Sequence, residues 1–514
     1  MNNHHQAPTL LLAVLLAACV VTDPDDPGSG GGGQGGDGGG TSTGGSTPIP
    51  PTPGDWGAHA IDDGGCGPTT GSGEDDAALP CDGASVLCVA ASAAPGGDGT
   101  ATAPFASIGA AVAVANDGAT VQVAAGTYGE NVVVQGKVVL LRGGFDPTFT
   151  TRNSRTQATC IDGGGQDSVI ALLEAGSSEV DGFQIRGGAG FSGDPFYEGG
   201  GGIYVDGGNP TLAHNVIENN SLSDPAESTG GGIRVINGGA TITRNHIRHN
   251  VAALGGGVAA SEGTVVLDHN TVSDNDGLGD HGAGLYLAGN VTVAGNLVSG
   301  NETGQVAGYG WGGGMVVFGE GTVAQISGNF FTGNRAPQLG GAIYIDDGAV
   351  ATLTGDLVVG NHTDGDGSRP CGAAIYVDGT AEGVGSTATF INATIADNDC
   401  DQPNEGSAIF VEAGSSLVLR NSILWGHANA DEIAVDGTSS MTASYCLGAS
   451  LLSGTGNLSE DPLFVGAGDY HLQATSPGVD AGDPSDAFDR EPEPNGGRIN
   501  LGAFGNTDQA TTTP

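Results

Sequence analysis

A glycine cluster followed by a short apolar run recurs along the middle of the chain, and this repeat constrains the fold more than any other feature. One copy reads GNFFTGNRAPQLGGAIYIDDG, residues 328–348. The apolar runs begin 25 to 34 residues apart, at Ile203, Ile233, Val258, Leu285, Met315, Ile343, Ile375 and Ile409. A repeat of this length is typical of solenoids and arrays, in which each unit packs on its neighbours.

The content of each repeat distinguishes between these architectures. One copy holds three short apolar runs, Ile203–Val205, Thr211–His214 and Val216–Ile217. No run shows the 3.6-residue spacing of a helix, so helical repeats are excluded. Three short strands per repeat are typical of a parallel β-helix. We therefore predict an all-β solenoid over residues 91–460 with three short strands per coil.

A polar series runs in step with the apolar runs. Its asparagines are Asn215, Asn245, Asn270, Asn296, Asn329, Asn392 and Asn421, with Asp356 in the same series. Most are followed five residues later by a second asparagine. Stacked coils place equivalent side chains about 4.8 Å apart, so each amide can donate to the next. Asparagine also tolerates the left-handed backbone of a sharp bend. We predict a structural asparagine ladder rather than a catalytic site.

The coils resemble the right-handed parallel β-helix, or pectin-lyase-like, superfamily. The pair Phe331–Asn334 and Gly340–Ile343 also resembles the FxxN and GGAI repeats of polymorphic outer-membrane proteins, which are adhesins and autotransporters. The resemblance covers roughly residues 95–506. It implies a right-handed coil, and its motifs are specific for the fold rather than for an activity.

Both ends of the solenoid have a predicted cover. Phe105, Ile108, Val112 and Ala115 fall on one helical face, which predicts a capping helix at the N-terminal end. An open end would expose unpaired strand edges. Residues 461–506 resemble the terminal segment of such proteins, so we expect a C-terminal cap there, followed by a tail at 507–514.

The N-terminal region indicates export. The apolar run Leu10–Ala18 is too short to span a membrane, and Leu16–Cys19 resembles the lipobox of bacterial lipoproteins. The resemblance implies a signal peptide at 1–19 and lipidation of Cys19, although Lys and Arg are missing before the apolar run. An ordinary secretory signal is the alternative. Residues 20–55 are a Gly/Ser/Pro-rich tether, and 56–90 form a small cysteine-containing segment. We expect a lipid-anchored protein at a bacterial outer membrane or cell surface.

Charge and cysteine content limit the partners. Thirteen Lys and Arg against 58 Asp and Glu give a net charge of −45, which excludes nucleic acid as a partner. Export permits disulfides, and seven cysteines besides Cys19 leave one free or paired outside the chain. Stacking of adjacent coils predicts a Cys371–Cys400 disulfide. We find no cofactor motif, and we expect a monomer.

Aromatic side chains recur at the outward position of the apolar runs. They are Tyr204, Tyr286, Tyr344, Tyr376 and Phe410, and Tyr309 and Trp311 lie in a neighbouring loop. Exposed rings at regular spacing can stack on sugars, which makes these residues candidate ligand contacts. Alternatively, the rings fit strand surfaces and are shielded by loops.

Acidic residues follow the same runs at Asp206, Asp346, Asp378 and Glu412. The row is either a calcium-binding edge or, more commonly, a solvated turn face. Lyase chemistry needs a base, and Lys137, Arg234 and Arg369 match no family motif. We therefore predict a non-catalytic surface protein that binds glycan or another surface. The alternative is a polysaccharide lyase or glycoside hydrolase.

Overall fold

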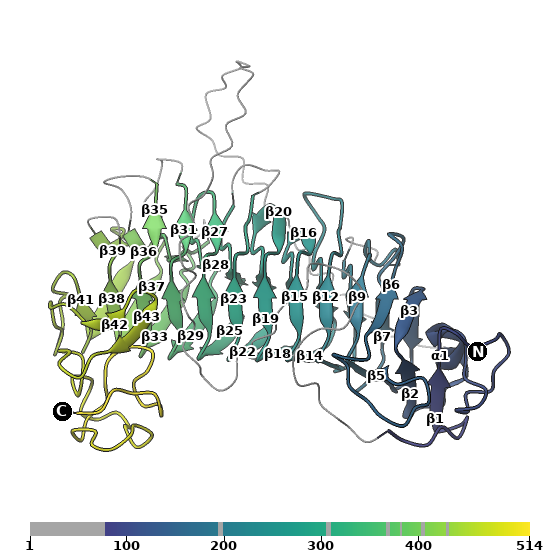
Figure 1. Cartoon of the computed structure of the whole chain (residues 1–514). Helices are drawn as coiled ribbons and strands as arrows, with labels where there is room; N and C mark the ends of the chain where they lie inside the picture. Colours follow the sequence, from purple (N-terminus) through teal and green to yellow (C-terminus); the bar gives the residue numbers. More distant parts are fainter. Residues whose placement is uncertain are drawn as a thin grey trace, which may run out of the picture. The chain divides into compact units, whose positions relative to one another are not determined.

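The computed structural model describes residues 78–193, 199–304, 310–365, 371–380, 383–401, 407–427 and 431–513, which belong to one compact unit (Figure 1). The predicted signal peptide, Cys19, the tether, Tyr309 and Arg369 lie outside the described residues. Within these ranges, no helix has the length and apolar character needed to cross a membrane.

Three long parallel sheets form the body of the described residues. The first sheet contains β1 (Val86–Val89), β2 (Ala119–Ala124), β5 (Val139–Phe145), β8 (Glu179–Asp181), β11 (Thr211–Ala213), β14 (Ala240–Thr243), β18 (Thr264–Asp268), β22 (Asn290–Ala294), β25 (Val323–Ser327), β29 (Val350–Thr354), β33 (Thr387–Ile391), β37 (Ser416–Arg420) and β40 (Ser440–Ser444). The second sheet contains β4 (Val132–Gln135), β7 (Ile170–Leu173), β10 (Ile203–Asp206), β13 (Ile233–Ile236), β17 (Val258–Ala260), β21 (Leu285–Leu287), β24 (Met315–Phe318), β28 (Ile343–Asp346), β32 (Ile375–Val377), β36 (Ser407–Val411) and β39 (Asp431–Val435). The third sheet contains β3 (Gly126–Gly129), β6 (Thr159–Asp162), β9 (Gln184–Arg186), β12 (Val216–Glu218), β15 (His246–Arg248), β19 (Thr271–Ser273), β23 (Leu297–Ser299), β26 (Phe330–Thr332), β30 (Leu357–Val359), β34 (Thr394–Ala396), β38 (Ile423–Trp425) and β41 (Leu447–Gly448).

Shorter strands complete the list of elements. They are the pair β16 (Val251–Leu254) and β20 (Asp276–His281), the row β27 (Arg335–Ala336), β31 (His362–Thr363) and β35 (Asp399–Cys400), and the antiparallel pair β42 (Phe464–Gly466) and β43 (Asp469–Leu472).

Each coil contributes one strand to each long sheet, as the sequence repeat predicts. Ile203 pairs in register with Ile170 before it and Ile233 after it. Side chains alternate along each strand, so Ile203, Val205 and their equivalents stack in a continuous buried core. The prediction of an all-β, right-handed parallel β-helix with three strands per coil is confirmed.

The capping helix lies where the sequence places it. Helix α1 (Ile108–Val114) buries Ile108, Ala111 and Val112 against the N-terminal end of the core. Its first amides are satisfied by the Glu130 carboxylate, which accepts hydrogen bonds from the backbone N of Ile108 and of Gly109, both at 2.8 Å. These contacts satisfy a helix terminus that would otherwise be left unpaired.

Two polar ladders run along the inside of the coil corners. In the first, the amide Nδ2 of Asn215 donates to Oδ1 of Asn245 at 3.0 Å and to the carbonyl of Val180 at 2.9 Å. The same pattern continues through Asn270, Asn296 and Asn329 and ends at Asp356. The second ladder contains Asn220, Asn250, Asn275, Asn301, Asn334, Asn361 and Asn398.

Asn392 and Asn421 lie outside the register of the first ladder, although Nδ2 of Asn421 donates to Oδ1 of Asn392 at 3.3 Å, so these two residues link adjacent coils from a position other than the predicted one. Both have φ of 51°, which is the left-handed bend one residue before the ladder position. The ladder position itself holds Ala393 and Ser422. Nδ2 of Asn392 instead donates to the Asn500 carbonyl, and Nδ2 of Asn421 donates to Asp486. The residue five positions after Ala393 is Asn398, which counting from Asn392 does not reach.

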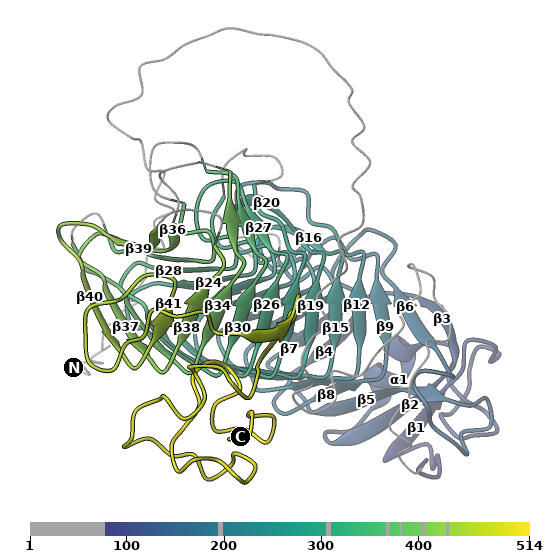
Figure 2. The ribbon, with the colours of Figure 1, turned by 60° about the vertical axis from the view of Figure 1, so that its left-hand side comes forward.

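The C-terminal segment covers a side of the solenoid rather than its open end. Tyr470 and Ala503 pack on outward side chains of the third sheet, among them Leu357 and Val359. Leu472 and Leu501 pack on Ile423 and Leu447. Figure 2 shows the yellow C-terminal segment running beside the strands of the solenoid. Leu452, from the loop before this segment, is one of the partly buried apolar side chains that pack against the core. The expected cap at 461–506 is therefore a lateral cover.

Disulfides join cysteines near each other in the coils. Cys371 is bonded to Cys400 and Cys81 to Cys88, and Cys160 is disulfide-bonded as well. Cys446 is the free cysteine among the described residues, and it is buried at the ladder position after Ser422. Burial raises the pKa of the Cys446 thiol to about 11, so the thiol is inert at neutral pH.

Candidate functional site at the outer edge of the coils

The outward aromatic residues are not an exposed stripe. Tyr204, Tyr344, Tyr376 and Phe410 are all buried, and Tyr286 is half-buried. Trp311 stacks on Tyr344 with ring centroids 5.9 Å apart, and Tyr344 stacks on Tyr376 at 5.5 Å. The expectation of ring faces free for sugar stacking is wrong for the buried rings, because Tyr344, Tyr376 and Phe410 pack on one another in a second apolar cluster. The Tyr204 ring stacks instead on Phe191.

The acidic row next to these rings is part of the same buried layer. The Tyr344 hydroxyl donates to Asp378 at 3.0 Å, and the Tyr376 hydroxyl donates to Glu412 at 2.5 Å. Burial, followed by repulsion from Asp378, raises the pKa of Asp346 to about 8. Asp346 and Asp378 are each 9% exposed, so the expected solvated turn face is wrong for these two residues. Asp206 instead accepts a hydrogen bond from Asn237.

A column of accessible polar side chains follows the second ladder. The residues directly after the ladder asparagines pair in parallel register from Asp276 through Glu302, Arg335 and His362 to Asp399. The asparagine side chains are buried, and alternation turns the next side chains outward. The short strands β27, β31 and β35 hold this column at the upper edge in Figure 1.

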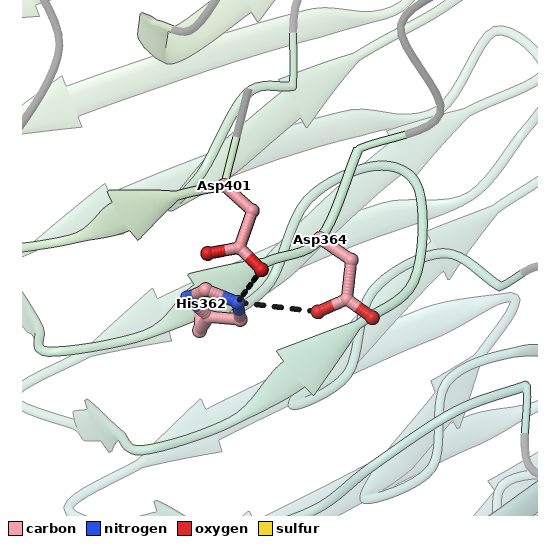
Figure 3. Close-up of side chains that lie close together, drawn as sticks. All are labelled: His362, Asp364 and Asp401. Atoms are coloured by element: carbon pink, nitrogen blue, oxygen red, sulfur yellow. Dashed lines mark ion pairs between the residues drawn. The ribbon is translucent and has the colours of Figure 1, made fainter. Parts of the chain in front are cut away.

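We define the outer-edge cluster as Glu302, Arg335, His362, Asp364, Asp399 and Asp401. The Arg335 guanidinium donates to both oxygens of Asp364 at 2.9 Å, and its Nη1 lies 2.9 Å from Glu302. His362 Nε2 lies 3.1 Å from Asp364 Oδ1 and 3.7 Å from Asp401 Oδ2 (Figure 3). These side chains are 29–66% exposed, so the cluster is accessible to a partner.

The Cys371–Cys400 disulfide supports the cluster from below. Cys400 lies between Asp399 and Asp401 and is buried with Cys371 and Ala373. Bidentate pairing of Arg335 fixes Asp364 in the neighbouring row. The cluster is therefore held by strand pairing, by an ion-pair network and by a covalent bond.

The donor set limits the chemistry of the cluster. One ligand atom from each of His362, Asp364 and Asp401 lies within 4.8 Å of the others. An imidazole with two carboxylates suits a transition-metal ion better than calcium, which prefers oxygen ligands alone. Asp364 already accepts two hydrogen bonds from Arg335, so a metal ion would compete with that pair. The cluster contains four carboxylates, one guanidinium and one imidazole, which suit polar recognition.

Sequence reasoning did not find this cluster. His362, Asp364, Asp399 and Asp401 stand in or beside very short strands, within sequence segments that vary from coil to coil, and nothing in their local motifs differs from other acidic segments. The sequence feature that could have located the cluster is spacing: each of these residues lies one or three positions after a second-ladder asparagine, Asn361 or Asn398. This spacing can be recognised only when Asn398 is assigned to the second ladder.

A comparison with family models supports the architecture of the middle of the chain. A family model described as a right-handed β-helix region matches residues 168–356. No curated protein matches the chain at a significant level. Pectate lyase Pel9A is similar in structure with 13% identity and a TM-score of 0.44, covering 82% of this chain and 96% of that one.

Two further solved structures show weaker similarity. XylC in complex with xylose has 11% identity and a TM-score of 0.41 over 73% of this chain and 86% of that one. An alginate lyase from Paenibacillus sp. str. FPU-7 has 15% identity and a TM-score of 0.32 over 69% and 98%.

Proposed function

We propose that the protein is an exported, lipid-anchored and non-catalytic binding protein of a bacterial outer membrane or cell surface, which recognises glycan or another surface through its outer edge. The observation that carries this proposal is the outer-edge cluster, in which accessible polar groups from successive coils are held in place. Glycan hydroxyls form hydrogen bonds with carboxylates, guanidinium and imidazole groups, and bonds to ionised groups are the stronger ones.

The test is a glycan screen with the full chain purified in detergent. Asp401→Asn and Glu302→Gln each remove a charge from the outer-edge cluster, and we expect them to weaken binding about tenfold, as the loss of one charge-assisted hydrogen bond does. His269→Ala is the matched control, because His269 is exposed and pairs with Asp268 elsewhere on the solenoid. A screen without any bound glycan or surface would contradict the function, and unchanged binding by both cluster variants would contradict the site.

The anchor has its own measurement. The Leu16–Cys19 motif supports lipidation of Cys19, so intact mass and detergent partitioning are expected to show an acylated N-terminus that Cys19→Ser abolishes. A soluble, unacylated chain in the native cell would contradict the anchored part of the proposal.

The competing function is polysaccharide cleavage. It predicts product release from an acidic polysaccharide panel, and detection of any product would replace the binding proposal. One observation speaks against a lysine base: Nζ of Lys137, the one lysine of the chain, donates to the carbonyls of Val112 at 2.6 Å and Ala115 at 2.8 Å. That lysine is engaged as a cap for the C-terminal end of α1.

A further inference from the structure

A hollow with a basic lining lies at the corner between the first and third sheets, several coils before the outer-edge cluster. Its lining includes Ser154, Arg155, Gln184, His214, Arg244 and His246. It stands at the start of the third-sheet strands β9, β12 and β15, whereas the outer-edge cluster follows the ends of later third-sheet strands. The two sites are therefore separate.

The lining is assembled by the stacking of consecutive coils. His214 and Arg244 occupy the left-handed bend of adjacent coils, each with φ of 53°. Gln184 and His246 both pair in register with Val216, which lies between them. The remaining wall is a turn in which Asn153 Oδ1 accepts hydrogen bonds from the backbone N of Arg155 and of Thr156. Rigid elements thus position the side chains of the hollow.

The charge of this hollow is opposite to that of the chain. With 13 Lys and Arg against 58 acidic residues, two arginines on one concave surface are a local concentration of positive charge, and two histidines line the same surface. Asp181, the carboxylate that contacts the lining residue His214 at 3.0 Å from its Nδ1, is also paired with the buried Arg152. Burial lowers the pKa of the Arg155 guanidinium from its ordinary value.

We propose that this hollow binds one oxyanion, a sulfate or carboxylate group of a partner molecule, between Arg155 and Arg244. Two guanidinium groups supply planar arrays of donors that match oxyanion geometry. Ser154 and Gln184 add neutral hydrogen-bonding groups to the same surface. Because the rest of the surface is strongly acidic, selectivity for an anion at this place needs a local structure such as this one.

The experiment is calorimetric titration of the full chain in detergent with inorganic sulfate and, separately, with acetate, at constant ionic strength. We expect saturable binding of at least one of these anions, and the anion that binds identifies the group recognised. The double variant Arg155→Gln/Arg244→Gln is expected to bind that anion at least about tenfold more weakly. Arg490→Gln is the matched control, since Arg490 is an exposed arginine of the C-terminal segment.

Thermal unfolding supplies a second measurement. Sulfate stabilises proteins in general by exclusion from their surfaces, so all three proteins are expected to share that part of the shift. Specific binding adds a saturable increase in the wild-type and control chains that the double variant lacks. Absence of saturation with both anions, or equal affinity in all three proteins, would overturn the proposal.

Discussion

The hydrogen-bond partners of a buried polar residue in this protein depend on which residue occupies the same position in the next coil. Asp356 ends the first ladder, where its Oδ1 accepts hydrogen bonds from the backbone N and from Nδ2 of Asn329, both at 2.8 Å. Its Oδ2 is buried without a donor among the described residues. In the preceding coil, Nδ2 of Asn329 donates to the Val293 carbonyl. Ile326 pairs in register with Val293, so the Ile326 carbonyl is the equivalent acceptor for a donor at position 356. A carboxyl can donate there only when it is protonated.

The first prediction concerns this carboxyl. Burial raises the pKa of Asp356 to about 7 from the ordinary value of 3.8. Its contribution to stability is fully present below pH 3.8 and is lost as the pH rises through about 7, by as much as about 4 kcal/mol. Asp356→Asn supplies a permanent donor, so urea unfolding is expected to show a gain at pH 8 that is absent at pH 4. An equal effect at both pH values would contradict this explanation.

Residue identity alone could not locate the end of the ladder. Asn392 and Asn421 are the asparagines nearest to the expected positions, and each has a neighbour that fills the ladder place with a smaller side chain. Asparagine is suited both to stacking and to left-handed bends, so the same residue type satisfies two adjacent positions. The ladder position and the bend position before it can be distinguished only by the strand register, in which Thr394 pairs with Leu357.

At the scale of elements, periodicity predicts strands well and surface chemistry poorly. The core positions Ile203 and Ile343 could be read from alternation, because a buried stack requires apolar side chains in every coil. Exposure of Tyr344 and Tyr376 could not be read, because neighbouring rings and loops decide it. The outer-edge cluster was missed for a related reason, since its rows depend on pairing between loops of different length.

The second prediction concerns helix α1 and its lysine. Lys137→Met removes two charge-assisted hydrogen bonds from the carbonyl end of the helix, which we expect to cost about 2 kcal/mol locally. Hydrogen exchange of residues 105–116 is expected to accelerate, while exchange of β29 remains unchanged. Arg490→Met is the control for loss of a positive charge. Unaltered exchange in α1 would show that the lysine is not needed as a cap.

At the scale of the whole molecule, the C-terminal segment stabilises the late coils from outside. Leu501 is 1% exposed and packs with Ile423, Leu447 and Leu472. Backbone contacts add to this packing, since Asn421 accepts a hydrogen bond from the backbone N of Asp483 and Thr394 accepts one from that of Ala503. The segment thus fixes coils in which the first ladder has no asparagine.

The third prediction follows from this attachment. Leu501→Ala leaves a cavity and is expected to weaken docking of the segment by about 2–5 kcal/mol. Limited proteolysis is then expected to remove residues 461–513 early, while fragments from the preceding coils persist. Leu451→Ala, at a position that is 69% exposed, serves as the control. Simultaneous loss of the segment and the coils would indicate one cooperative unit instead.

The first asparagine ladder ends before Ala393, and this affects how such a chain can lengthen by duplication of coils. Between Asn215 and Asn329, each coil carries its own amide link to the next coil, so a duplicated turn there would join the stack with its bonds already in place. Downstream, Asn392 and Asn421 are hydrogen-bonded to each other, and each is also bound to a single site in the C-terminal segment. A duplicated coil there would find no second matching site in the C-terminal segment. Growth by duplication is therefore compatible with the first part of the solenoid, and the last turns are confined to a constant number.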